Sequence, residues 1–565
     1  MRHLLTLIAI LYLFSACNSY EESSLTEERP LDIRLAPVSS TGVSEVIPVN
    51  AQIILHVSSE IDPQSLTQES LYIEDSQHNR LFSEISLTAQ TILLKPLRYL
   101  PPDADLFIIA TTSIQTREGK SLSKEVRLSF RSGPATGDTT PPLYLGDSFS
   151  YNANPIHPDT VLYFQFDEAI SPLGVTDDTI RVYIPDPLER VPGTVGVLGS
   201  LLYFRPDQPF SKLTSPNTDA GYGIYLDING SLTDLSGNVN SDAQRYFEVY
   251  ADTLAAPLEP VLPINTDTYD YDGTVYSIEN NGSTLFLGGD RGLQLCHYDS
   301  TVHSFTPLST LMTPEMGEIY AISQDSELPH LYLATSKGVA IIDISDLKEP
   351  EQIGFYPTET PVYGVDRFRE HLYLAATLSG MVDLNISTPS TPRLINTYPT
   401  QGIAFSVLST PSSGYGDYVS LSDFDKGMVL VDPANDIVMN ATFNEFYGQI
   451  RAIIPDQNDT TSYLALSSVG GVYRYDLQVT PPPLMSLLLR LPSYAYKIIS
   501  RRDQKFYVSL KGMGIALIDY QAAATITRIF TPPFEVTSFA YITEGMTGYL
   551  IIPDKEGALH VINAN

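Results

Sequence analysis

Seven short segments with one shared pattern dominate the second half of this 565-residue chain. Each begins with a glycine and continues as an alternating apolar run, as in "KGVAIIDIS" (Lys337 to Ser345). The glycines are Gly292, Gly338, Gly380, Gly427, Gly471, Gly514 and Gly557, at intervals of 42 to 47 residues. A nearly fixed period of this length, built from strand patterns, is typical of β-propeller blades of four strands each.

Two further strand patterns precede every glycine, for example "EIYAI" and "HLYLATS" ahead of Gly338. We expect the glycine to lie in the hairpin between two later strands, where positive φ is needed. An Asp or Asn five residues after the glycine occurs in five units and is expected to mark the strand exit, with a structural role. These residues are Asp343, Asn385, Asp432, Asp476 and Asp519.

The seventh unit has no fourth strand after it, because the chain ends at Asn565. The proline-rich segment from Ala256 to Asn265 precedes the first unit and resembles the outer strands of the other units. We therefore expect it to complete the last blade, which would close the ring and remove an exposed edge. This predicts a seven-bladed β-propeller over residues 256–565.

The repeat units resemble the LVIVD repeat of bacterial surface propellers. The nearest copy is "LYLATSKGVAIIDISDLKEPEQIGFY", Leu331 to Tyr356. The resemblance implies an extracytoplasmic propeller with a binding role, and it carries over no catalytic residues.

The first half of the chain shows short alternating strands separated by Pro and Asp, which indicates β-sandwiches. The fold class expected for the whole chain is therefore all-β, with two Ig-like β-sandwiches (32–133 and 138–252) ahead of the propeller. The stretches "IPVNAQIILHVSSEIDPQSL" and "ILLKPLRYLPPDADLFIIATTSI" resemble the bacterial Ig-like domain of S-layer and surface proteins. In the second copy "DTVLYFQFDEAISPLGV" and "LLYFRPDQPFSK" follow in the same order.

The N-terminus has the pattern of a secretion signal over residues 1–17, with an apolar stretch before Cys17. Phe14 to Cys17 resembles the lipobox of bacterial lipoproteins, which implies that Cys17 carries a lipid. An ordinary signal peptide with a chance cysteine is the alternative. Residues 18–31 are polar and acidic and predict a flexible tether.

The other cysteine, Cys296, lies in an apolar strand pattern and predicts a buried thiol.

Lipidation would place the protein in the bacterial cell envelope, at the outer membrane or cell surface, because Asn18 is not the Asp that retains some lipoproteins at the inner membrane. With 33 Lys+Arg against 66 Asp+Glu, the net charge of −33 opposes binding to nucleic acid. The only expected membrane contact is the lipid.

Enzyme signatures are scarce in this sequence. It has no Trp, no HExxH, no G-x-S-x-G and no P-loop pattern. We expect no cofactor, no catalytic residues and no enzymatic activity.

One basic residue lies at or near the hairpin glycine in five units: Arg291, Lys337, Lys426, Lys511 and Lys555. If these turns share one face, the cations could bind an anionic ligand such as an acidic sugar. The alternative is a set of solvated turns, because Asp290, Asp554 and Glu556 are close in sequence.

The stretch "TYDYDGTVYSIE" places Asp270, Asp272 and Glu279 at the spacing of a Ca²⁺ loop. It lacks an acidic first ligand and flanking helices, so a simple turn explains the same residues.

A second set of acidic and amide residues, Asp167, Glu168, Asp234 and Asn238, could line a cation site between the two sandwich domains. The alternative is that they are turn formers whose side chains bond nearby backbone amides.

Together these patterns predict a lipid-anchored surface protein that binds or adheres to extracellular protein or glycan. Two alternatives remain open. One is a hydrolase or lyase that acts on extracellular polysaccharide with carboxylates in the propeller funnel. The other is a purely structural envelope component.

Overall fold

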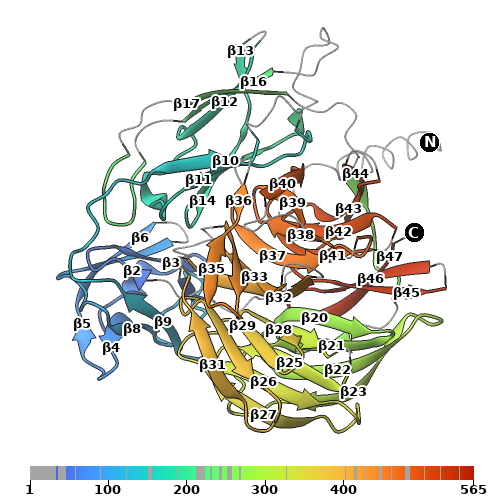
Figure 1. The fold of residues 1–565 in the computed structure, drawn as a ribbon. Coiled ribbons are helices and arrows are strands. Elements are labelled where there is room, and N and C mark those ends of the chain that lie inside the picture. Colours follow the sequence, from blue (N-terminus) through green and yellow to red (C-terminus); the bar gives the residue numbers. More distant parts are fainter. Residues whose placement is uncertain are drawn as a thin grey trace, which may run out of the picture. The chain divides into compact units, whose positions relative to one another are not determined.

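The regular structure of the described residues consists mainly of β-strands (Figure 1). The computed structural model describes residues 33–35, 46–57, 59–88, 91–122, 124–149, 156–185, 188–210, 223–228, 232–240, 245–250, 258–265, 269–325, 327–400, 402–412, 416–424, 427–443, 448–459, 461–476, 484–501, 503–521, 524–545 and 547–564. Within these ranges the only helical segments are two 3-10 turns, η1 (Pro63–Ser65) and η2 (Pro172–Gly174). No helix in these ranges has the length and apolar character needed to span a bilayer.

The chain divides into two compact units, residues 1–140 with 235–238, and residues 141–234 with 239–565. In the first unit, two sheets share one hydrophobic core that contains Leu55, Ile73, Ile92 and Leu106. One sheet has the order β1 (Ile33–Leu35), β3 (Ile53–Val57), β7 (Thr91–Pro96), β6 (Ser83–Thr88). The other has the order β2 (Val46–Ile47), β9 (Val126–Ser132), β8 (Asp105–Ala110), β4 (Leu71–Asp75), β5 (Arg80–Leu81).

The second unit begins with another pair of sheets around one core, which includes Phe164, Val182, Phe204 and Leu226. One has the order β10 (Tyr144–Asp147), β11 (Leu162–Phe166), β15 (Leu201–Pro206), β14 (Gly193–Leu198). The other has the order β13 (Leu188–Arg190), β12 (Ile180–Pro185), β16 (Gly223–Ile228), β17 (Arg245–Tyr250). This pair is called the second sandwich below.

The described residues in the rest of the second unit form seven sheets, numbered 1 to 7 along the chain, and this repeat region is a β-propeller. Sheet 1 contains β20 (Val275–Asn281), β21 (Thr284–Gly289), β22 (Gly292–Asp299) and β23 (Ser304–Leu311). Sheet 2 contains β24 (Ile319–Gln324), β25 (His330–Thr335), β26 (Gly338–Asp343) and β27 (Glu351–Pro357). Sheet 3 contains β28 (Gly364–Phe368), β29 (His371–Ala375), β30 (Met381–Asn385) and β31 (Arg393–Tyr398). Sheet 4 contains β32 (Ala404–Ser412), β33 (Gly416–Asp423), β34 (Gly427–Asp432) and β35 (Ile437–Asn440).

The last three sheets each recruit a strand from outside the regular order. Sheet 5 contains β37 (Ile450–Pro455), β38 (Ser462–Ser467), β39 (Gly471–Asp476), β40 (Leu484–Leu489) and an outermost β36 (Thr442–Phe443). Sheet 6 contains β41 (Ala495–Ser500), β42 (Lys505–Leu510), β43 (Gly514–Asp519), β44 (Thr525–Thr531) and an outermost β18 (Leu258–Pro260). Sheet 7 contains β45 (Ala540–Glu544), β46 (Thr547–Pro553), β47 (Ala558–Asn563) and β19 (Tyr269–Asp270).

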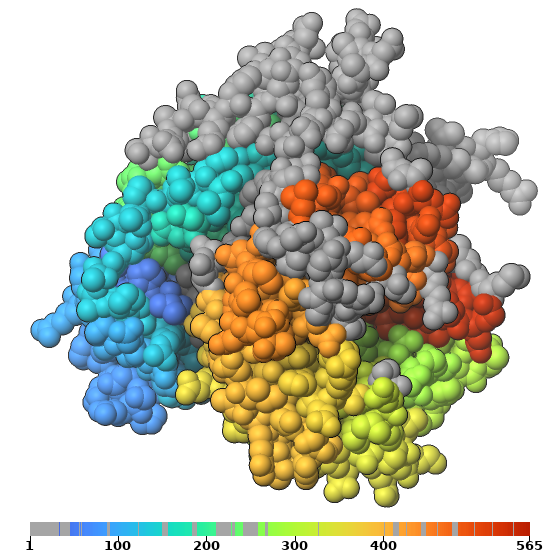
Figure 2. Space-filling view, viewed as in Figure 1, coloured from blue at the N-terminus to red at the C-terminus, as the bar shows by residue number. Residues whose placement is uncertain are grey.

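Hydrophobic clusters join each sheet to the next. In β25 (His330–Thr335), Leu331 and Leu333 pack with residues of sheet 1, whereas Tyr332 and Ala334 pack with residues of sheet 3. Both faces of such strands are buried, which explains their almost continuous apolar sequence. A further cluster joins sheet 7 to sheet 1 through Ile551, Val561, Leu285 and Cys296. In Figure 1 the red β46 and the green β20 accordingly lie near each other, and β20 contacts β45. Figure 2 shows the same view with all atoms, in which side chains of the yellow and orange segments fill the spaces between ribbons.

The strand that completes sheet 7 is not the one expected. From the predicted segment Ala256 to Asn265, Leu258–Pro260 pairs in parallel with β44 of sheet 6. Its end still reaches sheet 7, because Ile264 N–H donates to Val561 O at 2.8 Å. The regular fourth strand is Tyr269–Asp270, antiparallel to β47. Tyr269 and Tyr271 pack into the cluster between sheets 7 and 1, which is the physical reason for this choice.

The residues that close the repeat segments have the structural role predicted for them. The Asp343 and Asp519 carboxylates accept backbone N–H groups two residues on, from Ser345 at 2.8 Å and Gln521 at 3.0 Å. Such turns are a common use of Asp and Asn after strands. The buried thiol was also predicted correctly: Cys296 is fully buried, and burial raises its pKa to about 12.

Candidate functional site

The seven predicted glycines lie between the second and third strands of their sheets, so they share one end of the repeat region. All have positive φ, from 76° at Gly380 to 145° at Gly338. A Cβ on Gly338 would also press against the Tyr356 carbonyl oxygen of the outer strand β27. Only glycine meets both demands without strain, as predicted. We call this end of the sheets the glycine-turn end.

The predicted basic residues differ in what they contact. Arg291 donates through Nε to Asp272 O at 2.8 Å, and Lys337 donates through Nζ to Pro314 O at 2.7 Å. Both therefore bind nearby backbone. Lys555 is exposed. Lys511 is largely enclosed, and burial lowers the pKa of its ammonium group. Lys426 lies outside the described residues, as does the predicted lipidation residue Cys17.

The three carboxylates proposed for Ca²⁺ serve other contacts. Asp270 Oδ1 accepts the Asp272 N–H at 2.8 Å, which closes a tight turn. Glu279 Oε1 instead accepts Lys497 Nζ at 2.9 Å. The ligand atoms of Asp270, Asp272 and Glu279 are not gathered into one cluster among the described residues.

A collar of aromatic side chains runs along the inner edge of the sheets at the glycine-turn end. Neighbouring ring centroids lie 5.6 Å (Tyr276 to Tyr320), 4.6 Å (Tyr320 to Tyr363) and 5.1 Å (Tyr363 to Phe405) apart. The Arg451 guanidinium continues the series, 4.8 Å from the Phe405 ring and 5.7 Å from the Tyr496 ring. One residue from each of sheets 1 to 6 thus forms a continuous arc.

β-bulges explain why these side chains leave the plane of the sheet. The pairing register shifts around Tyr276, Tyr320 and Phe405, and again around Arg451 and Tyr496. A bulge inserts one unpaired residue and re-aims its side chain. In sheet 7 the corresponding residue is Thr537, which is exposed and has no ring. The collar therefore has a gap at sheet 7.

The residue that follows each collar position is small in six sheets and long in one. Sheets 1 to 5 and 7 have Ser277, Ala321, Gly364, Ser406, Ala452 and Ser538. Sheet 6 has Lys497, whose Nζ donates to Ile278 O at 2.8 Å and to Glu279 Oε1 at 2.9 Å. Because both acceptors belong to β20 of sheet 1, this lysine bridges sheets 6 and 1 past sheet 7.

The described carboxylates beside the collar are already bonded. Glu318 accepts the Tyr320 hydroxyl at 2.9 Å, and Glu535 accepts the Tyr496 hydroxyl at 2.9 Å. Burial is the main reason that the pKa values of Tyr320 and Tyr496 lie above the ordinary range. Burial, together with the Glu318 charge, likewise raises the pKa of Tyr363 to about 12. The tyrosines therefore remain neutral hydrogen-bond donors near neutral pH.

The second sandwich packs on the glycine-turn end of sheets 5 and 6, within the same compact unit. Val161 N–H donates to Pro492 O at 2.9 Å, and the Tyr163 and Tyr494 ring centroids lie 6.3 Å apart. Val161, Tyr163 and Leu201 form one buried cluster with Val469 and Tyr494. The sandwich therefore covers part of this end of the propeller.

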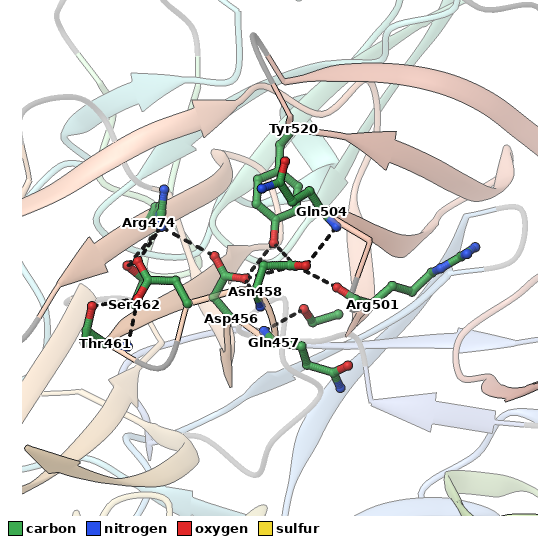
Figure 3. A network of polar contacts seen from close by, with 11 residues as sticks. Asp456, Gln457, Asn458, Thr461, Ser462, Arg474, Arg501, Gln504 and Tyr520 are labelled. Carbon is green, nitrogen blue, oxygen red and sulfur yellow. Dashed lines mark hydrogen bonds and ion pairs between the residues drawn. The ribbon is translucent and has the colours of Figure 1, made fainter.

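The opposite end of sheets 5 and 6 carries a polar network (Figure 3). The Asp456 carboxylate accepts the Tyr520 hydroxyl at 2.6 Å and the Asn458 N–H at 2.9 Å. Asn458 Nδ2 donates to Arg501 O, and its Oδ1 accepts the Gln504 N–H. Asp456 and Asn458 lie in the turn after β37 of sheet 5, and their partners belong to sheet 6, so the network joins the two sheets.

Comparisons with known proteins support the repeat but do not assign a family to the whole chain. A family model described as the LVIVD repeat matches residues 330–358, which span β25, β26 and β27. No curated protein matches the sequence.

Solved structures give only a distant likeness. The chain is similar to one titled "Crystal Structure of Mitotic Checkpoint Complex", with 13% identity, a TM-score of 0.42, and coverage of 56% of this chain and 98% of that chain. It is also similar to the "Myceliophteria_thermophila Cps50 (Swd1) beta-propeller domain", with 12% identity, a TM-score of 0.43, and coverage of 53% and 100%. The propeller assignment rests on the sheet order and the repeat match.

Proposed function

We propose that this protein is a lipid-anchored, cell-surface binding or adhesion protein that presents a seven-bladed propeller on two Ig-like spacer domains. In this proposal Cys17 carries the lipid, and residues 18–31 hold the folded part away from the membrane. The two sandwich regions, 32–133 and 138–252, extend the reach of the propeller. Its partners are extracellular proteins or glycans, and it needs no cofactor.

The collar supports a binding role more than a catalytic one. A polysaccharide hydrolase needs two carboxyl groups at a set separation across the reacting bond. Glu279, Glu318 and Glu535 are instead bound to Lys497, Tyr320 and Tyr496. A rigid inner edge of neutral tyrosines is better suited to recognition than to proton transfer.

The basic residues Arg291, Lys337, Lys426, Lys511 and Lys555 are proposed to contribute to recognition of anionic groups. The described members, Arg291, Lys337, Lys511 and Lys555, belong to turns of one end. Basic residues are few in a chain with net charge −33.

Two measurements test the proposal. The purified chain should bind a subset of glycans or extracellular proteins on arrays, without cleaving them. In cells, Cys17→Ser should release the protein from the membrane fraction, because it removes the thiol that would carry the lipid. Time-dependent shortening of any polysaccharide by the purified chain would favour the hydrolase or lyase alternative instead.

A further inference from the structure

Three basic side chains that are distant in sequence lie close enough at the glycine-turn end of sheets 6 and 7 for Arg205 and Lys555 to act electrostatically on Lys511. Lys511 and Lys555 come from the turns of these two sheets, and Arg205 comes from β15 of the second sandwich. Leu201, Tyr203 and Arg205 share one face of β15 because side chains alternate along a strand. Leu201 packs against Val469 and Tyr494 of the propeller. The face of β15 that carries Leu201, Tyr203 and Arg205 is therefore the face that points toward the propeller.

Lys511 is the central member of this group. Its backbone is fixed on both sides, since its N–H donates to Tyr494 O at 2.7 Å and its carbonyl accepts the Ser493 hydroxyl at 2.8 Å. Burial is the main reason that the pKa of its ammonium is lowered; the Glu535 charge raises this pKa, and the Arg205 and Lys555 charges lower it further. Its Nζ makes no hydrogen bond or ion pair with any residue that the structure describes.

Two carboxylates near the group, those of Glu535 and Asp554, accept other hydrogen bonds. Glu535 accepts the Tyr496 hydroxyl. Asp554, next to Lys555, accepts His560 Nε2 at 2.8 Å and the Glu556 and Ala558 N–H groups. Glu556, next to Lys555, is exposed to solvent. Lys511 is the enclosed member of the group and has no ion-pair partner among the described residues, so a bound anion would compensate its charge.

Glu535 connects the collar with these cations, because it accepts the hydroxyl of Tyr496, at one edge of the gap, and interacts electrostatically with Lys511. In sheet 7 the exposed Thr537 places no ring between the last rings of the arc, Tyr496 of sheet 6 and Tyr276 of sheet 1. Tyr276 is 41% exposed. An exposed tyrosine ring offers a flat apolar surface with a polar edge, which suits a sugar ring.

We propose that Lys511, Lys555 and Arg205 bind the carboxylate of an acidic sugar, whose ring lies in the collar gap between Tyr496 and Tyr276. The ligand class is a uronate-bearing polysaccharide. This inference rests on the proposed binding function and gives it a place and a chemistry.

The test measures binding of trigalacturonate to the purified full-length chain by calorimetry. Two further probes separate charge from shape: the methyl ester of trigalacturonate keeps the sugar rings without the charge, and inorganic phosphate keeps a charge without the sugar. Lys511→Met and Arg205→Gln remove one cation each. Lys348→Met is the matched control, because Lys348 is an exposed lysine in a turn that follows β26. Thermal unfolding of each variant confirms that it is folded.

We expect trigalacturonate to bind, and Lys511→Met and Arg205→Gln each to weaken binding by about tenfold or more, as for charge-assisted contacts in a partly enclosed site. Lys348→Met should leave affinity unchanged, and the methyl ester and phosphate should both bind more weakly than trigalacturonate.

Equal binding by all variants, or no binding of trigalacturonate, would overturn the inference. Phosphate that binds as tightly as trigalacturonate would overturn the sugar part of it. If the chain still binds another glycan or protein, and Lys511→Met does not affect that binding, the proposed function stands while this site is wrong.

Discussion

Buried polar side chains at the two ends of the propeller sheets differ in their bonding partners. At the end opposite the glycine turns, buried carboxylates join neighbouring sheets: Asp325 binds Arg367 of sheet 3 at 2.8 Å, and Asp456 binds Tyr520 of sheet 6 at 2.6 Å. Asp325 and Asp456 both directly follow the inner strand of their sheets. At the glycine-turn end, the enclosed Lys511 has no such partner among the described residues. Polar contacts between sheets occur at both ends, since Lys497 bridges sheets 6 and 1 at the glycine-turn end. The enclosed Lys511, however, has no counterpart among Asp325, Asp456 and their partners at the opposite end.

The glycine turns should make the largest contribution to stability at their end. Gly338→Ala should lower the free energy of unfolding by about 3 kcal/mol, because a Cβ meets both an unfavourable φ of 145° and the Tyr356 carbonyl. Denaturant unfolding of the purified chain measures this loss.

Gly512→Ala provides the matched control. Gly512 also has positive φ, 70°, but a Cβ there would have no atom within 4 Å. Its cost should be only about 1 kcal/mol, from the backbone alone. Equal losses for the two variants would show that the close approach of the outer strand does not matter.

Asp456 and Lys511 should show the largest difference between the two ends in the effect of a substitution on the free energy of unfolding. Asp456→Ala removes the acceptor of the Tyr520 hydroxyl and of the Asn458 N–H, and should destabilise the protein by about 2 kcal/mol. Lys511→Met should change the free energy of unfolding by no more than about 0.5 kcal/mol, because no described partner is lost.

Denaturant unfolding of both variants checks this contrast. If Lys511→Met were as destabilising as Asp456→Ala, Lys511 would contribute to stability as much as the network around Asp456 does.

Local patterns in the sequence were enough to predict the sheets of the repeat region and their turns. The spacing of Gly292 to Gly557, the apolar strands and the turn-forming Asp343 depend only on neighbouring residues. The strand that completes sheet 7 was predicted incorrectly, because proline-rich Ala256 to Asn265 and alternating Tyr269 and Tyr271 both have strand character. Only packing against the last sheet distinguishes them.

The collar could have been found in the sequence. Tyr276, Tyr320, Tyr363, Phe405 and Tyr496 occupy the same position in five of the seven repeats. The bridge from Lys497 to Glu279 could not, because these residues are 218 positions apart and meet only when the ring closes. Arg205 was missed for a similar reason, since its place depends on how the second sandwich packs.

The smallest expected effect concerns pH and Asp459, beside the network of Figure 3. The Thr461 hydroxyl and N–H, together with Ser462 and Arg474, lower the pKa of Asp459 to about 2, from an ordinary value of 3.8. Because the folded pKa is lower than the unfolded one, the ionised carboxylate stabilises the protein above the unfolded pKa. That stability is lost as pH falls through the folded pKa.

Asp459→Asn should therefore lower the unfolding midpoint most near neutral pH, and its difference from the unmodified chain should shrink between about pH 5 and pH 2. Thr461→Val removes the hydroxyl that donates to Asp459 Oδ1 at 2.7 Å, so it should reduce this pH dependence while leaving the carboxylate in place. Unfolding midpoints at a series of pH values measure both effects. A difference that stays constant with pH would mean that these hydrogen bonds do not favour the ionised carboxylate, and that this end of the sheets is fastened by Asp456 and Asn458 without a contribution from the charge of Asp459.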